Sequence, residues 1–322
     1  MLLPGGIGPH RLFLGRFWRN PGISDAPARQ AQPADISQLL LKTGSENPSG
    51  SRVICYRGHG DTAYKLTPSI FRSSITKENE HILLRELVAA HPEDFHGDIT
   101  ALEMLVRMQH YSLPTRLLDV TFNPLVALYF ACEAVKKRKS FYKSGKRTTK
   151  TIEKDGHVKI LTVPRNLVCY FDSDKVSCIT NLARLNYDYK CKINTELNTQ
   201  KFNSSTPIKR LLHFIRQEKN GFLGEILPLD IEKILLVKPK QNNKRILAQA
   251  GAFFAFGTDE EIESGTIDKI GIKDLLIDAG SKAQIRHDLD KLGINEKTLF
   301  PEIERAARYI TGTLEAEIIP SL

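Results

Sequence analysis

Two strongly apolar helices, separated by a polar stretch, dominate the pattern of hydrophobic positions in the middle of the chain. Apolar residues at helical spacing predict a helix over residues 98–111. It ends before Pro114, because the residue preceding a proline disfavours the α region. A second helix is predicted to begin at Asn123-Pro124, since asparagine caps free N–H groups and proline suits the first helical position. This helix is apolar on every side up to Val135, so we expect it to be buried.

The polar residues between these helices stand where a core element should have none. They are Gln109, His110, Thr115, Arg116, Asp119, Thr121 and Asn123. A polar group buried without a partner costs about 1–3 kcal/mol, so these side chains either satisfy one another or face a cleft. In the first case Arg116 and Asp119 form an internal ion pair, Asn123 is only a cap and His110 is a satisfied buried histidine. For the cluster as a whole we favour a functional cleft, because binding sites combine apolar walls with a few convergent polar groups.

The rest of the pattern predicts an α+β fold, with a mixed central β-sheet flanked by helices and a helical C-terminal segment. Strands are predicted over residues 52–58, 158–163, 167–171, 234–237, 245–257 and 267–272. Helices are predicted over residues 80–90, 282–292 and 302–310, and a loop over 186–206. Gln249 falls within one of the predicted strands, where it either lines the same cleft or bonds to a neighbouring strand.

Charge divides the chain into parts. The 322 residues carry a net charge of +9, of which residues 1–34 contribute +3 and residues 136–150 contribute +8. We therefore expect a loosely attached basic segment at 1–34 and a single domain at 35–320, with a basic loop at 136–156. A charge run is usually a solvated loop; the alternative is a footprint for nucleic acid.

Other features exclude several classes of protein. No apolar run approaches the roughly 20 residues that span a bilayer, and no signal peptide is recognisable, so we expect a cytoplasmic protein without a membrane partner. The five cysteines are odd in number and form no C-x-x-C pair, which argues against a disulfide framework and a structural zinc site. No metal is predicted.

The chain resembles the FRG domain family, named for a (Phe/Tyr)-Arg-Gly motif that here is Tyr56-Arg57-Gly58. The family's Gln-His-x-x-x-Pro-Thr-Arg-Leu-Leu-Asp-x-Thr-x-Asn-Pro segment and the helix after it match residues 109–131 almost throughout. Later family segments are similar to residues 245–253 and 299–301, and the resemblance covers roughly residues 50–312. His59 departs from the pattern, since many members have glutamine there.

A second resemblance, to mono-ADP-ribosyltransferases, implies an activity. Tyr56-Arg57-Gly58 looks like the first motif of that fold, and Thr121 with the helix after it looks like the second. Gln249 stands where the third motif has a glutamate, which leaves catalysis open. The resemblance implies an NAD cleft and allows a central sheet that is split in two.

Roles for the candidate residues follow from this second resemblance. Arg57 would pair with the pyrophosphate, Gly58 would let the dinucleotide approach, and Thr121 would bond backbone or ribose. Tyr111 or Tyr129 would stack on the nicotinamide, and Asp119 would replace the missing glutamate. Catalytic roles would thus fall to Arg57, Asp119, Thr121 and Gln249. Cofactor binding would fall to Tyr56, Arg57, Gly58, Gln109, His110, Thr115, Arg116 and Asn123.

Three functions stay open at this point. The first is an NAD-dependent transferase or glycohydrolase acting as a toxin or phage-defence effector. The second is a nucleic-acid-binding module or nuclease that uses the basic loop, although no Asp/Glu cluster suits metal-dependent phosphodiester chemistry. The third is a catalytically inert scaffold.

Overall fold

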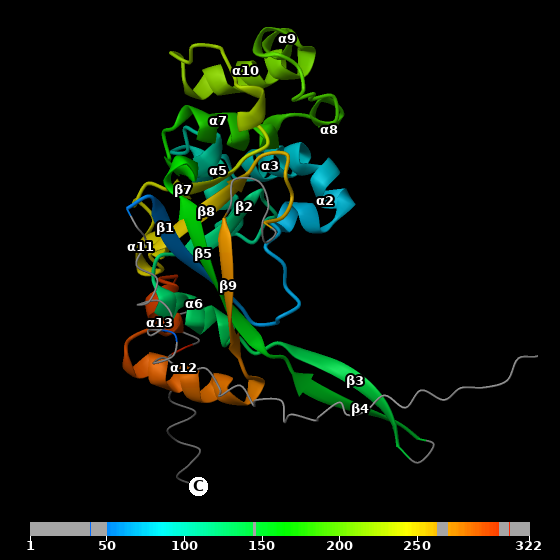
Figure 1. Cartoon of the computed structure of the whole chain (residues 1–322), viewed down its shortest axis with the longest axis vertical. Helices are drawn as coiled ribbons and strands as arrows, with labels where there is room; N and C mark the ends of the chain where they lie inside the picture. Colours follow the sequence, from blue (N-terminus) through cyan, green and yellow to red (C-terminus); the bar gives the residue numbers. More distant parts are fainter. Residues whose placement is uncertain (1–38, 40–49, 144–145, 263–269, 303–308, 310–322) are drawn as a thin grey trace, which may run out of the picture. The chain divides into compact units, whose positions relative to one another are not determined.

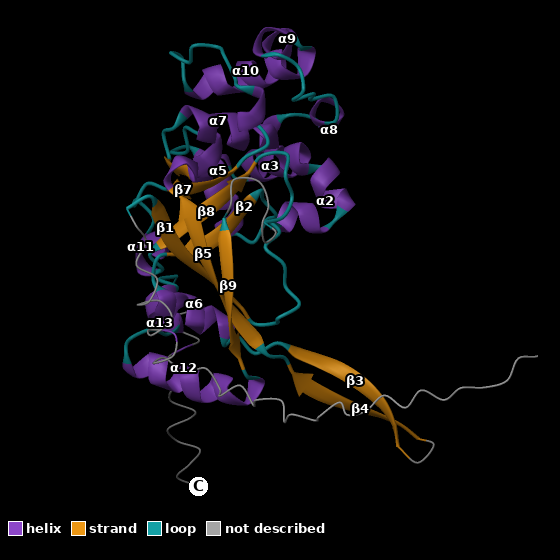
Figure 2. Cartoon of the chain, in the orientation of Figure 1, coloured by secondary structure: helices purple, strands orange, loops and turns teal. Residues whose placement is uncertain are grey.

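The structure is a computed structural model, and it describes residues 39, 50–143, 146–262, 270–302 and 309. The predicted N-terminal segment 1–34, the domain boundaries at 35 and 320, and nearly all of the predicted helix 302–310 lie outside these residues. Within them the fold is α+β, with a mixed sheet flanked by helices (Figure 2), as predicted. None of the described helices is long and apolar enough to cross a membrane.

Seven strands form the main sheet, in the order β6-β7-β8-β2-β1-β5-β9 (Figure 1). All neighbouring strands are antiparallel except β6 and β7, which are parallel. The strands are β1 (Arg52–His59), β2 (Leu117–Thr121), β5 (Gly156–Pro164), β6 (Val168–Tyr170), β7 (Ile234–Lys238), β8 (Gly251–Phe256) and β9 (Gly271–Ile277).

The main sheet is nearly divided between β1 and β2. These two strands share a single register pair, Tyr56 opposite Thr121, whereas β1 pairs with β5 along its whole length. The sheet therefore consists of two halves, β6-β7-β8-β2 and β1-β5-β9, which meet at one point. Beyond it, side chains rather than strand ladders connect β1 to β2.

Helices cover the two halves. The main ones are α3 (Glu80–Ala90), α5 (Ala101–His110), α6 (Pro124–Ala131), α7 (Asp174–Thr180), α10 (Thr206–Glu218) and α12 (Lys282–Lys291). Shorter ones are α2 (Ser74–Glu78), α4 (Pro92–Phe95), α8 (Tyr187–Lys190), α9 (Thr199–Ser204), α11 (Lys244–Ala248) and α13 (Glu296–Leu299).

Two large apolar clusters pack against the main sheet. Helix α6 packs on β1 and β5, and one apolar cluster joins it to β9, α12 and α13. A larger cluster joins β2, β7 and β8 to α3, α5 and α7. Alternation along β1 sends Cys55 into the larger cluster and Tyr56 into the other, as the two-residue period of a strand requires. A third cluster lies among α7, α9 and α10.

Local sequence explains the two central helices. Thr100 and Glu103 form a capping box at the start of α5. Asn123 caps α6 by accepting from the Leu125 N–H at 2.9 Å, and Pro124 occupies its first position, as predicted. Most of α6 is buried, which confirms the expectation from its uniform hydrophobicity, but it ends at Ala131 rather than near Val135.

Three predictions of local structure are wrong. The basic segment is not a loop but an antiparallel hairpin, β3 (Lys136–Lys143) and β4 (Lys146–Glu153), because its Thr and aromatic residues favour extended strands. The stretch 245–257 begins as helix α11 and becomes strand only at Gly251, since Asn243 caps the helix. Residues 186–206 contain α8 and α9, each also capped by an asparagine.

Candidate functional site

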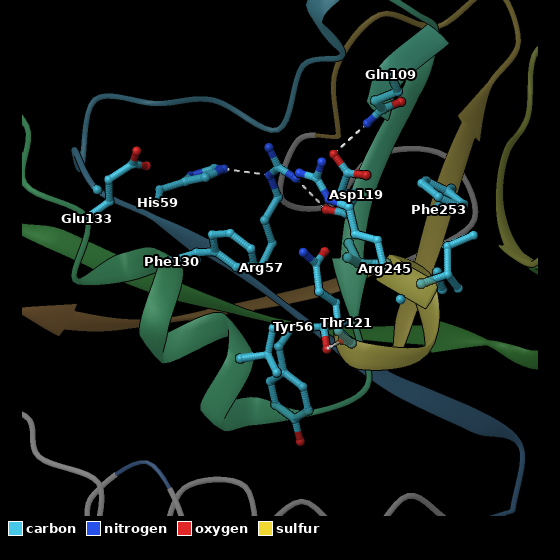
Figure 3. A pocket seen from close by; sticks show the side chains of 18 of the residues that line it. Tyr56, Arg57, His59, Gln109, Asp119, Thr121, Phe130, Glu133, Arg245 and Phe253 are labelled. Atoms are coloured by element: carbon cyan, nitrogen blue, oxygen red, sulfur yellow. Dashed lines mark hydrogen bonds between the residues drawn. The ribbon is translucent and has the colours of Figure 1, made fainter. Parts of the chain in front are cut away.

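A cavity of about 260 Å³ lies where β1 and β2 diverge, walled also by α5, α6 and α11. It is lined by eight of the eleven residues that the sequence singled out. These are Tyr56, Arg57, Gly58, Gln109, His110, Asp119, Thr121 and Gln249. The two motifs that lie about 60 residues apart in the sequence, together with the later segment that holds Gln249, therefore meet at one site (Figure 3).

Arg57 is the central cation of the cavity. Its Nη1 donates to the backbone carbonyl of Asp119, and its Nε donates to Nε2 of His59 at 2.8 Å. Among the described residues, no carboxylate lies within salt-bridge distance of its guanidinium. Burial lowers the pKa of Arg57, with Asp119 acting in the opposite direction. A half-buried guanidinium held by neutral acceptors suits an anionic ligand.

A pair of buried histidines holds Arg57 in place. Because Arg57 Nε can only donate, His59 Nε2 must accept, and the His59 proton therefore lies on Nδ1. His59 Nδ1 in turn donates to His157 Nε2 at 2.8 Å. Burial, and then the charge of Arg57, lower the pKa of His59 to about 2. Burial, and then Lys159, lower the pKa of His157 to about 4, so both rings are neutral at pH 7.

A second chain of hydrogen bonds orients the Asp119 carboxylate. The hydroxyl of Thr115 donates to Gln109 Oε1 at 2.7 Å, and the Gln109 amide donates to Asp119 Oδ2. Thr115 itself is fully buried and lies behind the cavity wall. Asp119 is exposed, and Figure 3 shows it facing Arg57 and Arg245. The cavity thus presents one oriented carboxylate beside guanidinium groups.

Positive charge exceeds negative charge in the lining. Three arginines, Arg57, Arg72 and Arg245, line the cavity together with the carboxylates of Asp119 and Glu133. His110 also lines the cavity; its Nδ1 accepts from the Asn243 amide at 3.1 Å, and burial lowers its pKa. The arrangement favours an anion, with Asp119 free to act on a positively charged part of the same ligand.

Thr121 and Gln249 form the floor where the two halves meet. The Thr121 hydroxyl donates to the Gln249 carbonyl at 2.6 Å and accepts from the Asn123 N–H at 2.9 Å. The Gln249 amide donates to the Leu299 carbonyl at 3.0 Å. Ala250, which follows, has a φ of 44°, in the left-handed region that non-glycine residues rarely adopt. Thr121 therefore ties the end of β2 to this strained turn.

Three predicted site residues are not part of the lining. Arg116 does not pair with Asp119: its guanidinium is buried, makes two bonds to Glu80 and donates to the carbonyls of Phe256 and Gly257. Asn123 caps α6 and Thr115 supports Gln109. These three residues position the site without facing the cavity.

Gly58 and the aromatic residues also differ from expectation. A Cβ at Gly58 would lie 1.9 Å from the Ala127 carbonyl oxygen, so this glycine lets α6 approach β1 closely. Tyr111 is exposed and Tyr129 is buried beside Arg286, and neither lines the cavity. Phe130 provides a ring in the cavity instead. The sequence analysis missed it because it treated α6 as uniformly buried.

His59 and His157 were also missed as a pair. Only the strand register, which places His59 opposite His157, brings them together across β1 and β5. The available signal was that each lies next to a glycine at a strand end. For metals, no group of three or more His, Cys, Asp or Glu side chains within the described ranges could hold an ion.

Two grooves adjoin the cavity. One, of about 820 Å³, shares His110, Arg245 and Ile246 with it. The other, of about 840 Å³, shares Phe130, Glu133 and Arg245. A ligand larger than the cavity could therefore extend into either groove.

Comparison with known proteins identifies one part of the chain. The FRG domain model matches residues 52–140, which hold β1, α5, β2 and α6 together with Arg57, Gln109 and Asp119. No curated protein and no solved structure matched the chain. Residues 52–140 of this chain therefore match the FRG domain, and most of the residues that line the cavity of about 260 Å³ come from this segment.

Proposed function

We propose that the cavity binds an NAD-type dinucleotide and that the protein transfers or hydrolyses its ADP-ribose group. The observation that carries this proposal is Arg57, a half-buried guanidinium held by the neutral acceptors His59 and Asp119 O. Binding a pyrophosphate would give this cation an anionic partner in a fork geometry that suits two phosphate oxygens.

The size of the cavity supports partial enclosure of such a ligand. A volume of about 260 Å³ lies slightly below the range of roughly 300–1,000 Å³ for pockets that enclose a whole ligand. We therefore place the pyrophosphate and the nicotinamide ribose in the cavity. The adenosine end would extend into the groove of about 820 Å³, past His110 and Arg245.

The divided sheet supports the resemblance to ADP-ribosyltransferases. In that fold the dinucleotide lies in a cleft between two sheet halves, and here the cavity lies beside the single β1–β2 register pair. Arg57 on β1 and Thr121 on β2 are the residues that resemble the first two motifs. Gln249 lines the cavity at the place of the third.

The reaction would break the bond between ribose C1′ and the nicotinamide nitrogen. The electron pair leaves with nicotinamide, and an acceptor or water forms the new bond to C1′ and loses its proton. Positive charge develops on the ribose, and a fixed carboxylate nearby stabilises it. Asp119, oriented by Gln109, is the residue we propose for this role, and Gln249 would bond a ribose hydroxyl.

Calorimetric titration of NAD into the protein tests binding. We expect Arg57→Ala to lose about tenfold or more in affinity, the effect of removing a charge-assisted pair. Arg85→Ala is the matched control, since Arg85 also donates to a backbone carbonyl but lies on α3 away from the cavity. Equal affinity in the two variants, with both folded by circular dichroism, would refute a ligand at Arg57 and favour a scaffold.

Release of nicotinamide tests the chemistry separately. We expect Asp119→Asn to bind NAD but to release nicotinamide at least about 100-fold more slowly, by analogy with loss of one electrostatic stabiliser. Unchanged turnover would remove Asp119 from the mechanism.

The cytoplasm is the compartment we propose for the protein, because all five cysteines are free thiols.

A further inference from the structure

The hairpin β3–β4 carries a charge that nothing in the proposed function uses. Residues 136–150 contain eight Lys or Arg and no acid, and Glu153 at the base is the only acid of the two strands. The side chains of Lys136, Lys137 and Arg138 are exposed. Exposed basic side chains on a nearly acid-free ribbon suit a polyanion such as a phosphate backbone.

The base of the hairpin leads into the groove of about 840 Å³. Lys136 and Glu153 line this groove, as do Phe130 and Arg245, which also line the cavity. The groove thus runs from the hairpin to the proposed NAD site.

Alternating rings and guanidinium groups form one wall of this groove. The Arg286 Cζ lies 3.9 Å from the centroid of the Tyr129 ring, and the Tyr129 and Phe130 centroids are 5.7 Å apart. The wall continues from Phe130 to Phe300 at 6.0 Å, and the Arg245 Cζ lies 4.8 Å from the Phe300 centroid. The rings of Tyr129 and Phe300 are buried, so the guanidinium planes of Arg286 and Arg245 lie between them and the groove. Nucleobases stack on guanidinium planes.

The distribution of charge over the groove and the hairpin indicates where the bases and the phosphates of a nucleic acid would lie. Glu133, Glu153 and Glu296 line it along with the basic residues, and carboxylates disfavour a phosphate. The hairpin, by contrast, is almost free of acids. A single strand of nucleic acid fits both parts, with its phosphates along the hairpin and an unpaired base against the guanidinium planes of the groove wall. A duplex would keep its bases stacked within the helix.

We infer that the hairpin and this groove bind single-stranded nucleic acid and present one of its nucleotides to the cavity as the acceptor of ADP-ribose. The acceptor role rests on the proposed function, whereas the binding surface does not. In the reaction, a base or sugar atom would form the bond to C1′ and lose its proton as nicotinamide leaves.

Fluorescence anisotropy with labelled oligonucleotides, single-stranded DNA and RNA of one sequence and the matching duplex, tests the surface. In the triple variant Lys136→Gln, Lys137→Gln, Arg138→Gln, we expect the affinity for the single strand to fall at least about tenfold. The slope of log affinity against log salt concentration should fall by about two, as three lost phosphate contacts require. The matched control is Lys192→Gln, Lys201→Gln, Lys209→Gln, which removes the same charge from exposed positions on the helical side. The control should bind as the parent does.

Arg286→Lys tests the stacking wall, since lysine keeps the charge but lacks the planar group. We expect about fivefold weaker binding of the normal oligonucleotide and no change for an abasic one. No binding at low salt, equal weakening by both triple variants, or tighter binding of the duplex would overturn the inference.

The two proposals fail separately. The hairpin variant should bind NAD as the parent does, because none of its three residues lines the NAD cavity. Oligonucleotide binding without NAD binding would keep the surface and remove the acceptor role. NAD binding without oligonucleotide binding would overturn this inference and leave the proposed function standing.

Discussion

At the scale of single residues, the orientation of Arg57 depends on which ring nitrogen of His59 carries the proton. The Arg57 Nε–H donates to His59 Nε2, so this nitrogen must stay unprotonated. The His59 proton then lies on Nδ1 and forms a hydrogen bond to the ring of His157. A glutamine at position 59 could reproduce both bonds, with its oxygen accepting from Arg57 and its amide donating to His157. A leucine could reproduce neither.

Leucine and glutamine at position 59 should therefore differ in their effect on NAD binding. In His59→Leu, Arg57 loses an acceptor at a cost of about 1–3 kcal/mol, and we expect NAD affinity to fall about tenfold. The NAD affinity of His59→Gln should stay within about twofold of that of the parent. Calorimetry measures both, with urea unfolding as the check of stability. If glutamine weakened binding as much as leucine, the hydrogen-bond role of His59 would be wrong.

The two histidines also make stability depend on pH. Their folded-state pKa values, about 2 for His59 and about 4 for His157, lie below the value of about 6.5 expected in the unfolded chain. The unfolded state therefore binds more protons between these values, so stability is complete above pH 6.5 and falls as pH decreases. Arg57, Arg72 and Lys159 oppose protonation, and for His157 Asp61 and Asp274 favour it.

We expect each histidine to contribute up to about 1.4 kcal/mol per pH unit to this loss between pH 6 and pH 4. Urea unfolding across that range measures the slope. The double variant His59→Gln, His157→Gln should have a flatter profile. A profile as steep as that of the parent would show that other groups cause the loss.

At the scale of elements, the approach of α6 to β1 determines where the motif residues lie. Gly58 permits that approach, and the buried Lys282 of α12 extends it by donating to the carbonyls of Gly60 at 2.7 Å and Glu133 at 2.9 Å. The cavity wall made by Phe130 and Arg57 depends on this packing.

Gly58→Ala should consequently destabilise the fold by at least about 2 kcal/mol, because the new Cβ would lie 1.9 Å from one backbone atom and 2.6 Å from another. Gly97→Ala is the control, since nothing lies within 4 Å of its Cβ, and its free energy of unfolding should change by less than about 0.5 kcal/mol. Denaturant midpoints compare the two. Similar values would contradict the close contact.

Elements were predictable where local signals agreed. The periodic stretches predicted α3 to the residue and α5 and α6 to within about one helical turn, and β-branched runs predicted β1, β5 and β7. The hairpin and α11 were not predictable in this way, because charge suggested a loop in one case and apolar residues suggested a strand in the other. The site residues were found from their motif, but Arg116 shows that a motif does not distinguish a buried support from a cavity wall.

At the scale of the whole described domain, the two sheet halves are joined by one strand pair and by side chains. Arg57 on β1 bridges them by donating to the Asp119 carbonyl of β2, and α6 packs against both β1 and β2. The resemblance allowed a split sheet, but the sequence could not predict where it divides, because the strand register between β1 and β2 depends on contacts distant in the chain. A ligand in the cavity would add contacts to both halves.

NAD should therefore protect both halves from hydrogen exchange. At 100 times its Kd a ligand stabilises the native state by about 2.7 kcal/mol. We expect slower exchange in β1 and β5 as well as in β2 and β8, measured by mass spectrometry with and without NAD. Protection confined to one half would contradict binding across the division.

Arg245 lies at the junction of the cavity and both grooves, and it stacks on Phe300 and pairs with Glu302 at 3.6 Å. In evolutionary terms, a substitution of Arg245 would change the cavity and both grooves at once, and selection would act against it for each of these effects. Divergence of acceptor preference among proteins of this architecture would then be confined to the outer ends of the grooves. The hairpin and α12 would vary, while the arginine at the junction would be inherited unchanged.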